Sequence, residues 1–166
     1  VADAAGNLGT PSASVSFSLD TISNQVNGDA NANTLTATNA KDLLTGLGGT
    51  DTFSFPSLAL SLFPSVDRIT DFAIGTDSLK GPTGMTPSKI ANLGAVTDLD
   101  ATAITALLSS SVFMANSTAA FTSLDPVGIT RTYVALNDGT DGFSPTSDAL
   151  VEITGYSGLL DNLLLS

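Results

Sequence analysis

The sequence predicts a mainly β fold, in which a short parallel β-roll is capped by a β-rich segment with a few short helices. Two observations carry this prediction. Residues 28–54 divide into three consecutive nonapeptides, GDANANTLT, ATNAKDLLT and GLGGTDTFS, which share a polar residue at position six and a large apolar residue at position eight. In the last third of the chain, residues 133–136 and 149–153 form two apolar runs separated by a long polar loop, as expected for two strands.

Each nonapeptide is predicted to form one half-turn of a parallel coil. A loop of about six residues bends the chain, and a strand of about three residues turns the apolar side chain inward. The inward residues are Leu35, Leu44 and Phe53, and the polar residues at position six are Asn33, Asp42 and Asp51. Successive loops should alternate between two edges, so the loops of Asn33 and Asp51 stack and Asp42 faces the other edge. A weaker copy over 19–27 places Asn24 at position six and Val26 at position eight.

The loops predict a calcium site. Calcium takes six to eight oxygen ligands, which carboxylates and the backbone carbonyls of glycine-rich loops can supply. Three loops make at most one complete site, and the neutral Asn33 lowers its charge, so we expect weak affinity, about 10⁻⁴ to 10⁻³ M. The alternative is a metal-free coil, in which Asn33 hydrogen-bonds its own loop.

Composition indicates an acidic protein that still forms a core. The chain has 16 acidic and 5 basic residues, a net charge of −11 and a mean hydropathy of +0.29. Hydrophobic residues make up 42% of the 166 positions, enough for one buried domain and too many for an acidic disordered segment. Such a surface repels nucleic acid and anionic membranes, and no apolar run approaches the roughly 18 residues of a membrane span. We expect neither a nucleic-acid partner nor a membrane span.

Several enzyme classes are excluded by composition. The chain contains no cysteine and no histidine, which removes zinc–thiolate, haem and Ser-His-Asp chemistry, and it has no Gly-x-Ser-x-Gly elbow. Asp98 and Asp100 could form a glycosidase pair, but they precede a predicted helix, where capping is the simpler role. We therefore expect a protein without enzymatic activity.

Two short helices are predicted after the repeats. Thr86 and Pro87 form a helix start, followed by Ile90 and Leu93 at helical spacing. Asp100 forms the second start, and its helix should run to about Ser110 with an apolar stripe of Ile104, Leu107 and Leu108. The following run, 111–121, is expected to add three core residues, Phe113, Met114 and Phe121.

The polar loop between the last two strands is rich in acids and glycine. Its polar side chains are those of Asn137, Asp138, Asp141 and Asp148. We interpret them as ordinary turn residues, and a second ion site is the alternative.

The third nonapeptide resembles the calcium-binding repeat of the RTX (repeat-in-toxin, hemolysin-type) family, G-G-x-G-x-D-x-U-x. The match consists of Gly46, Gly49, Asp51 and Phe53 at positions one, four, six and eight, with Leu47 in place of the second glycine. Residues 67–79, DRITDFAIGTDSL, resemble the segment that closes RTX rolls in secreted proteases. The resemblance implies that Ile69, Phe72, Ile74 and Leu79 close the coil. It further implies a calcium ligand set drawn from Asn33, Asp42, Gly46, Gly48, Asp51, Asp71 and Asp77, with Asp51, Asp71 and Asp77 forming the tightest site. Asp67 is expected only to pair with Arg68 or to cap a turn.

Two further resemblances concern the context of the chain. Residues 27–166 are similar to the bluetail domain at the C-termini of large repetitive cyanobacterial proteins, on the segments FMAN (113–116), AAF (119–121), TYVALNDG (132–139) and EITG (152–155). Residues 2–21 resemble the last strand of a bacterial Ig-like repeat, with Val15, Phe17 and Leu19 alternating with serine. We expect residues 1–21 to be a residual strand or linker and 22–166 to be one domain, with repeats (28–54), a roll cap (55–85), and helices and C-terminal strands (86–166). The start, VADAAGNLG, reads as that of a C-terminal fragment.

These resemblances imply a non-enzymatic, calcium-binding C-terminal module of a large secreted or cell-surface protein. It would leave the cell unfolded by type I secretion and fold outside on binding calcium, with LLDNLLLS (159–166) as the candidate secretion signal. The expected partners are calcium, the type I secretion machinery and components of the cell surface or extracellular matrix. Two alternatives stay open: the tail of an RTX protease or lipase, and an adhesive surface-binding domain.

Overall fold

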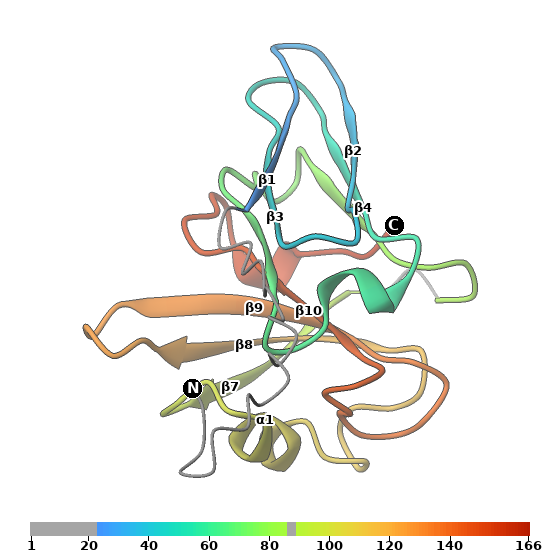
Figure 1. Cartoon of the computed structure of the whole chain (residues 1–166), viewed down its shortest axis with the longest axis vertical. Coiled ribbons are helices and arrows are strands. Elements are labelled where there is room, and N and C mark those ends of the chain that lie inside the picture. The colour runs from blue at the N-terminus through green and yellow to red at the C-terminus, as the bar shows by residue number, and fades with distance from the viewer. Residues whose placement is uncertain (1–22, 86–88) are drawn as a thin grey trace, which may run out of the picture.

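The computed structural model describes residues 23–85 and 89–166, so the expected Ig-like strand within 1–21 lies outside the described residues. The protein is mainly β, as predicted. Figure 1 shows a coil of short strands at one end of the molecule and a layer of longer strands, covered by one α-helix, at the other. Among the helices of the described residues, none has the length and hydropathy that crossing a membrane requires.

The repeat region forms the predicted coil. One of its sides consists of β1 (Asn24–Asn27), β3 (Asp42–Thr45) and β5 (Asp67–Ile69), and the other of β2 (Thr34–Thr36), β4 (Thr52–Ser54) and β6 (Ser78–Lys80). All neighbouring strands within each side are parallel. Asp42 begins a strand, which excludes a helix at this position.

The register of these strands confirms the phase of the repeat. Val26 pairs with Leu44, and Leu35 pairs with Phe53, so residues eighteen positions apart lie side by side. Leu35, Leu44 and Phe53 are all buried in one core, as predicted. The weak copy over 19–27 is in phase too, because Asn24 lies beside Asp42.

Residues 67–79 do more than cap the coil, because they form its third turn. Ile69 of β5 lies beside Leu44 of β3, and Leu79 of β6 lies beside Phe53 of β4. This turn begins later in the chain than the nine-residue period predicts, because an insertion that contains the 3₁₀-helix η1 (Leu58–Ser61) precedes it. The end of the chain covers the outer side of β6, where Leu165 forms a parallel bridge with Leu79 and the N–H of Ser166 donates to the Leu79 carbonyl (2.8 Å).

The second half of the chain extends one side of the coil into a seven-stranded sheet. Its strands are β7 (Ala91–Val96), β8 (Thr118–Leu124), β9 (Thr130–Leu136) and β10 (Ala149–Glu152), and the sheet has the order β1-β3-β5-β10-β9-β8-β7. The two strands predicted near the C-terminus are confirmed as β9 and β10, which pair antiparallel. β10 also pairs parallel with β5, and thereby joins the coil to the hairpin of β8 and β9.

Two cores lie on opposite faces of this sheet. One fills the coil, where Phe53 contacts Phe72 with ring centroids 5.7 Å apart. The other lies under α1 (Ala101–Leu107) and contains the fully buried Ile104, Leu108, Phe113 and Phe121. The helix start at Asp100 is confirmed, because its carboxylate accepts hydrogen bonds from the N–H groups of Thr102 and Ala103. A short 3₁₀-helix, η2 (Leu160–Asn162), precedes the C-terminal residues.

Three predictions for this half were wrong. Ile90 and Leu93 do not belong to a helix, because residues 91–96 form β7 and pair with β8; Thr86 and Pro87 themselves lie outside the described residues. Met114 is 51% exposed, since it follows Phe113 on a turn and points away from the core. The helix α1 ends at Leu107, short of the expected Ser110.

Candidate metal site

The residues at position six form a hydrogen-bonded ladder along each edge of the coil. On the first edge, the N–H of Asn33 donates to Asp51 Oδ1 (2.9 Å), and the N–H of Asp51 donates to Asp77 Oδ1 (3.0 Å). On the second edge, the N–H of Asp42 donates to Asp67 Oδ1 (2.7 Å). Each carboxylate therefore accepts a hydrogen bond from the backbone of the equivalent residue one turn earlier, which ties successive turns together.

Three of these side chains, those of Asn33, Asp42 and Asp77, also close their own loops. The N–H of Asp29 donates to Asn33 Oδ1 (2.7 Å), and the N–H of Ala73 donates to Asp77 Oδ2 (2.8 Å); Asp42 accepts the corresponding bond from Thr38. The acceptor lies four residues after the donor in every case. Asn33 thus hydrogen-bonds its own loop, which is the alternative that the sequence left open.

Asp71 reaches the third loop, where the sequence placed it. Its Oδ1 accepts the N–H of Gly46 (3.0 Å), and its Oδ2 accepts the N–H of Leu47 (2.8 Å). Asp51, Asp71 and Asp77 therefore all contact the stacked loops of the first edge. Asp42 lies on the other edge, where its side chain accepts from Thr38 and Asn24.

The loops of the first edge stack so closely that glycine is required. A Cβ on Gly28 would lie 2.2 Å from Asn33 Oδ1 and 2.6 Å from the carbonyl oxygen of Gly46. A Cβ on Gly46 would lie 2.3 Å from Asp51 Oδ2. Gly48 has only ordinary contacts, and its N–H donates to the carbonyl oxygen of Asp29 (3.1 Å).

Asp51 differs from Asp42, Asp71 and Asp77 in its hydrogen bonds. It is only 2% exposed, and its Oδ2 takes part in none of the hydrogen bonds found among the described residues, whereas both oxygens of Asp42, Asp71 and Asp77 accept hydrogen bonds. Asp51 Oδ2 lies beside Gly46, whose carbonyl oxygen lies beside Gly28. Asp51 Oδ2, Asn33 Oδ1 and the Gly46 carbonyl oxygen therefore lie around the two glycines of this edge, and oxygen atoms of these kinds are the ligands that calcium takes. In residues 23–85 and 89–166, no group of three or more acidic side chains is arranged to hold a metal ion.

Asp67 is the acid whose importance the sequence did not indicate. It is fully buried, and its Oδ2 has no hydrogen-bond partner among the residues that the structure describes. Burial raises the pKa of Asp67 to about 7, and the nearby carboxylate of Asp42 raises it further, against the hydrogen bond from the Asp42 N–H. The expected pair with Arg68 is not observed, because the Arg68 Nε instead lies 3.6 Å from Glu152 Oε1. The spacing of Asp67 and Ile69 as positions six and eight was the signal that could have revealed it.

The acidic loop before β10 repeats the same capping arrangement. Asp148 is buried, and its two oxygens accept the N–H groups of Asp138 (2.8 Å) and Ser144 (2.7 Å). Burial raises the pKa of Asp148. Asp138 accepts the N–H of Thr140, and Asp141 that of Ala115. The contacts of Asp138 and Asp148 are those of turn residues, the interpretation preferred from the sequence, whereas Asp141 links this loop to Ala115.

No family model matches the chain, and no match is found among curated proteins.

Proposed function

We propose that the protein is a non-enzymatic calcium-binding module at the C-terminal end of a large secreted or cell-surface protein of RTX type. In this proposal the chain leaves the cell unfolded through type I secretion and gains stability from calcium outside. The observation that carries the proposal is Asp51 Oδ2, a carboxylate oxygen that accepts no hydrogen bond from the described residues at the glycine corner of the first edge.

The ligand set in this proposal is smaller than the sequence suggested. Asp51 would hold the ion, together with the Asn33 side chain and the carbonyl oxygen of Gly46. Calcium would supply positive charge at a buried carboxylate. Asp71 and Asp77 keep the loop in place by accepting the N–H groups of Gly46, Leu47, Asp51 and Ala73. Asp42 stays outside this ligand set because it lies on the other edge of the coil, and Gly48 because it has only ordinary contacts with the neighbouring loop.

The coupling between calcium and folding follows from mass action. An ion that binds only the folded state stabilises it by RT ln(1 + [L]/Kd), roughly 2.7 kcal/mol at a hundredfold excess over Kd. The protein carries a net charge of −11, so bound cations also reduce repulsion between its acids. Low calcium inside a cell would therefore favour the unfolded, transportable chain.

The acids of the described residues favour a role without catalysis. Asp100, considered for a glycosidase pair, caps α1, Asp138 and Asp148 accept N–H groups within their own loop, and Asp141 accepts the N–H of Ala115 from another loop. These carboxylates are thus occupied by backbone N–H groups, which suits a structural module.

Calcium titration of two matched variants tests the proposal. Asp51→Asn removes one negative ligand and keeps the side-chain shape, so calcium affinity should fall at least about tenfold. Asp29→Asn removes the same charge from the adjacent exposed loop, where Asp29 accepts the N–H of Asn31, and should change affinity much less. Isothermal titration gives the affinities, and circular dichroism of the calcium-free proteins shows whether both variants fold.

A selective rise in melting temperature with calcium, with magnesium as the control, is the second expected result. Calcium binding by Asp51→Asn as tight as by the parent would reject the site. A parent protein that binds no calcium at all would reject the function, and would leave Asp51 as a residue that links successive turns by accepting the N–H of Asn33.

A further inference from the structure

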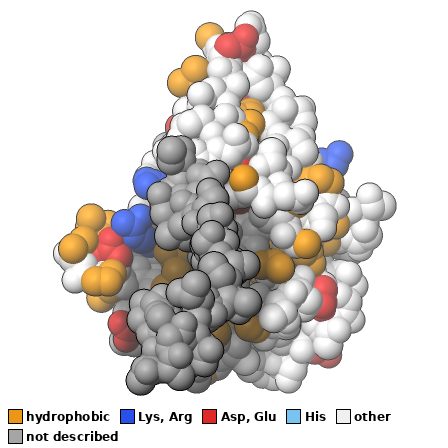
Figure 2. Space-filling model, in the orientation of Figure 1, with side chains coloured by type: hydrophobic (Ala, Val, Ile, Leu, Met, Phe, Trp, Pro, Cys, Tyr) orange, Lys and Arg blue, Asp and Glu red, His pale blue; other side chains and the backbone are white. Residues whose placement is uncertain are grey.

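The hairpin of β8 and β9 carries an exposed apolar tip. Leu124, Val127 and Ile129 are 50%, 78% and 51% exposed. Figure 1 shows the hairpin extending to one side of the molecule, and Figure 2 shows hydrophobic side chains next to charged ones on that side. Large apolar side chains grouped on a protruding element are typical of an interaction surface.

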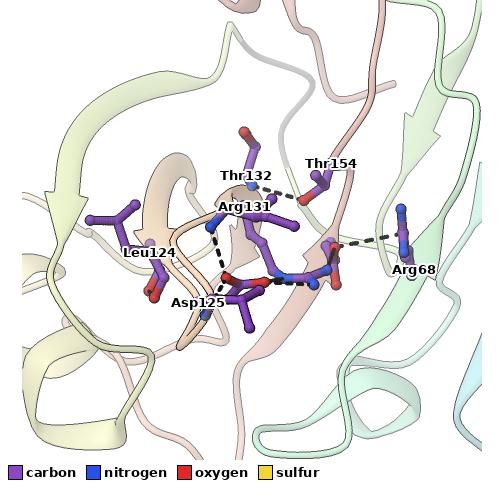
Figure 3. Close-up of polar contacts among 10 residues, drawn as sticks. Arg68, Leu124, Asp125, Arg131, Thr132 and Thr154 are labelled. Carbon is purple, nitrogen blue, oxygen red and sulfur yellow. Dashed lines mark hydrogen bonds and ion pairs between the residues drawn. The ribbon is translucent and has the colours of Figure 1, made fainter.

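The conformation of this tip is fixed by charged hydrogen bonds at its base. Arg131 donates through Nε (3.1 Å) and Nη2 (2.9 Å) to Asp125 Oδ2, and through Nη1 to Glu152 Oε1 (2.9 Å) (Figure 3). Asp125 Oδ1 accepts the N–H groups of Val127 (3.0 Å) and Ile129 (2.8 Å). The hydrogen bond from Ile129, with those from Arg131, holds the pKa of Asp125 below its usual range. A turn ordered in this way loses little entropy on binding a partner.

A groove of about 570 Å³ lies between the tip and the turn before α1. Its apolar walls are Leu99, Leu124, Pro126 and Val127, and Tyr133 also lines it. The Tyr133 ring stacks on Phe121 with centroids 5.5 Å apart, which holds the ring in place. Burial raises the pKa of Tyr133 to about 12, so its hydroxyl stays protonated and can donate a hydrogen bond. The groove has the volume and the largely apolar lining of a ligand-binding site, and is large enough for more than one side chain of a peptide.

The charges around the groove are negative overall. Arg131 lies within ion-pair distance of both Asp125 and Glu152, so its positive charge is already balanced. Asp98 also lines the groove, is exposed, and forms no ion pair within the described part of the chain. The net charge of −11 opposes binding of a second copy or of an anionic lipid surface. A partner segment with a basic residue next to an apolar one would complement both the acidic side chains around the groove and its apolar walls.

We infer that this groove binds a peptide segment of a partner protein in which apolar side chains alternate with lysine or arginine. An apolar side chain would occupy the space between Leu99 and Val127, and the neighbouring cation would lie at Asp98. The inference involves neither the coil nor calcium, so it stands or falls separately from the proposed function.

Nuclear magnetic resonance titration of the ¹⁵N-labelled protein provides the test. The probes are the peptides Ac-Gly-Leu-Lys-Leu-Lys-Gly-NH₂ and Ac-Gly-Leu-Glu-Leu-Glu-Gly-NH₂. The lysine peptide should cause saturable shifts of amides in residues 98–99 and 124–133, and the glutamate peptide should cause none. Asp98→Asn should weaken binding of the lysine peptide about threefold to fivefold, as for a partly exposed ion pair, and Val127→Ser should weaken it by a similar or larger factor.

Two control variants separate the groove from general effects. Asp161→Asn removes an equal charge from another exposed position, and Val112→Ser removes an exposed apolar side chain outside the groove. Neither should change binding. Equal binding of the two peptides, shifts elsewhere on the protein, equal effects of the controls, or no binding of the lysine peptide would overturn the inference. Concentration-dependent dimers in sedimentation that bury the same residues would show that a second copy occupies the groove instead.

Discussion

Replacement of Asp67 by asparagine should remove most of the dependence of stability on pH. In the folded protein, burial raises the pKa of Asp67 from 3.8 to about 7. The folded state therefore binds the proton more tightly than the unfolded state. This stabilisation is fully present below about pH 4 and is lost as the pH rises through about 7. The difference of about three pKa units corresponds to about 4 kcal/mol at about 1.4 kcal/mol per unit.

Urea unfolding of the parent and of Asp67→Asn between pH 4 and pH 8 measures this effect. The free energy of unfolding of the parent should fall by up to about 4 kcal/mol across the range. The variant cannot ionise at this position and keeps the acceptor for the Asp42 N–H, so its free energy should fall much less. The remaining slope should come from Asp148, whose pKa is also raised by burial. Equal slopes in the two proteins would refute the reasoning, because the proton would then be bound elsewhere.

Three other predictions concern the loops, the core and catalysis. Gly46→Ala should lower the free energy of unfolding, measured by urea titration, by about 2 kcal/mol, since the new Cβ would lie 2.3 Å from Asp51 Oδ2. Gly139 has open space around it, so Gly139→Ala should change the same free energy by less than about 0.5 kcal/mol. Phe53→Ala should cost about 3 to 5 kcal/mol because the ring is fully buried, and an equal loss for the exposed Val112→Ala would contradict this packing. No hydrolysis of esters, peptides or glycans above buffer background is expected, and turnover that disappears on mutation of one acid would show an enzyme.

The coil could be predicted because each of its loops and strands depends on residues that are close together in the sequence. Position six and position eight recur every nine residues from Asn33 to Phe53, and each loop needs only its own residues and one neighbouring turn. The capping of α1 by Asp100 likewise follows from a few consecutive residues. In these segments, the order of residue types determines which side chains face inward and which face the edge.

In the second half, β9, β10 and the start of α1 were predicted, but β7 was not, because it is defined by pairing with a distant strand. Ile90 and Leu93 have helical spacing, yet pairing of residues 91–96 with β8 outweighs that weak local preference. The same holds for the candidate site. The sequence indicated Asp51 and Asp71, but it did not indicate their contacts. Asp71 accepts two N–H groups from the loop, whereas one oxygen of Asp51 accepts none, and both facts depend on how the turns stack.

The position of β10 constrains when the protein can fold. This strand comes from residues 149–152, yet it lies between β5 and β9 in the middle of the sheet. During translation, the coil and the β8–β9 hairpin emerge from the ribosome first, but the strand that connects them emerges long after β5. Pairing between such distant segments is slow, because a long loop must close before any contact is gained. Completion of the sheet must therefore wait until residues 149–152 are available, and until then the edge of β5 that β10 will occupy stays open to other strands.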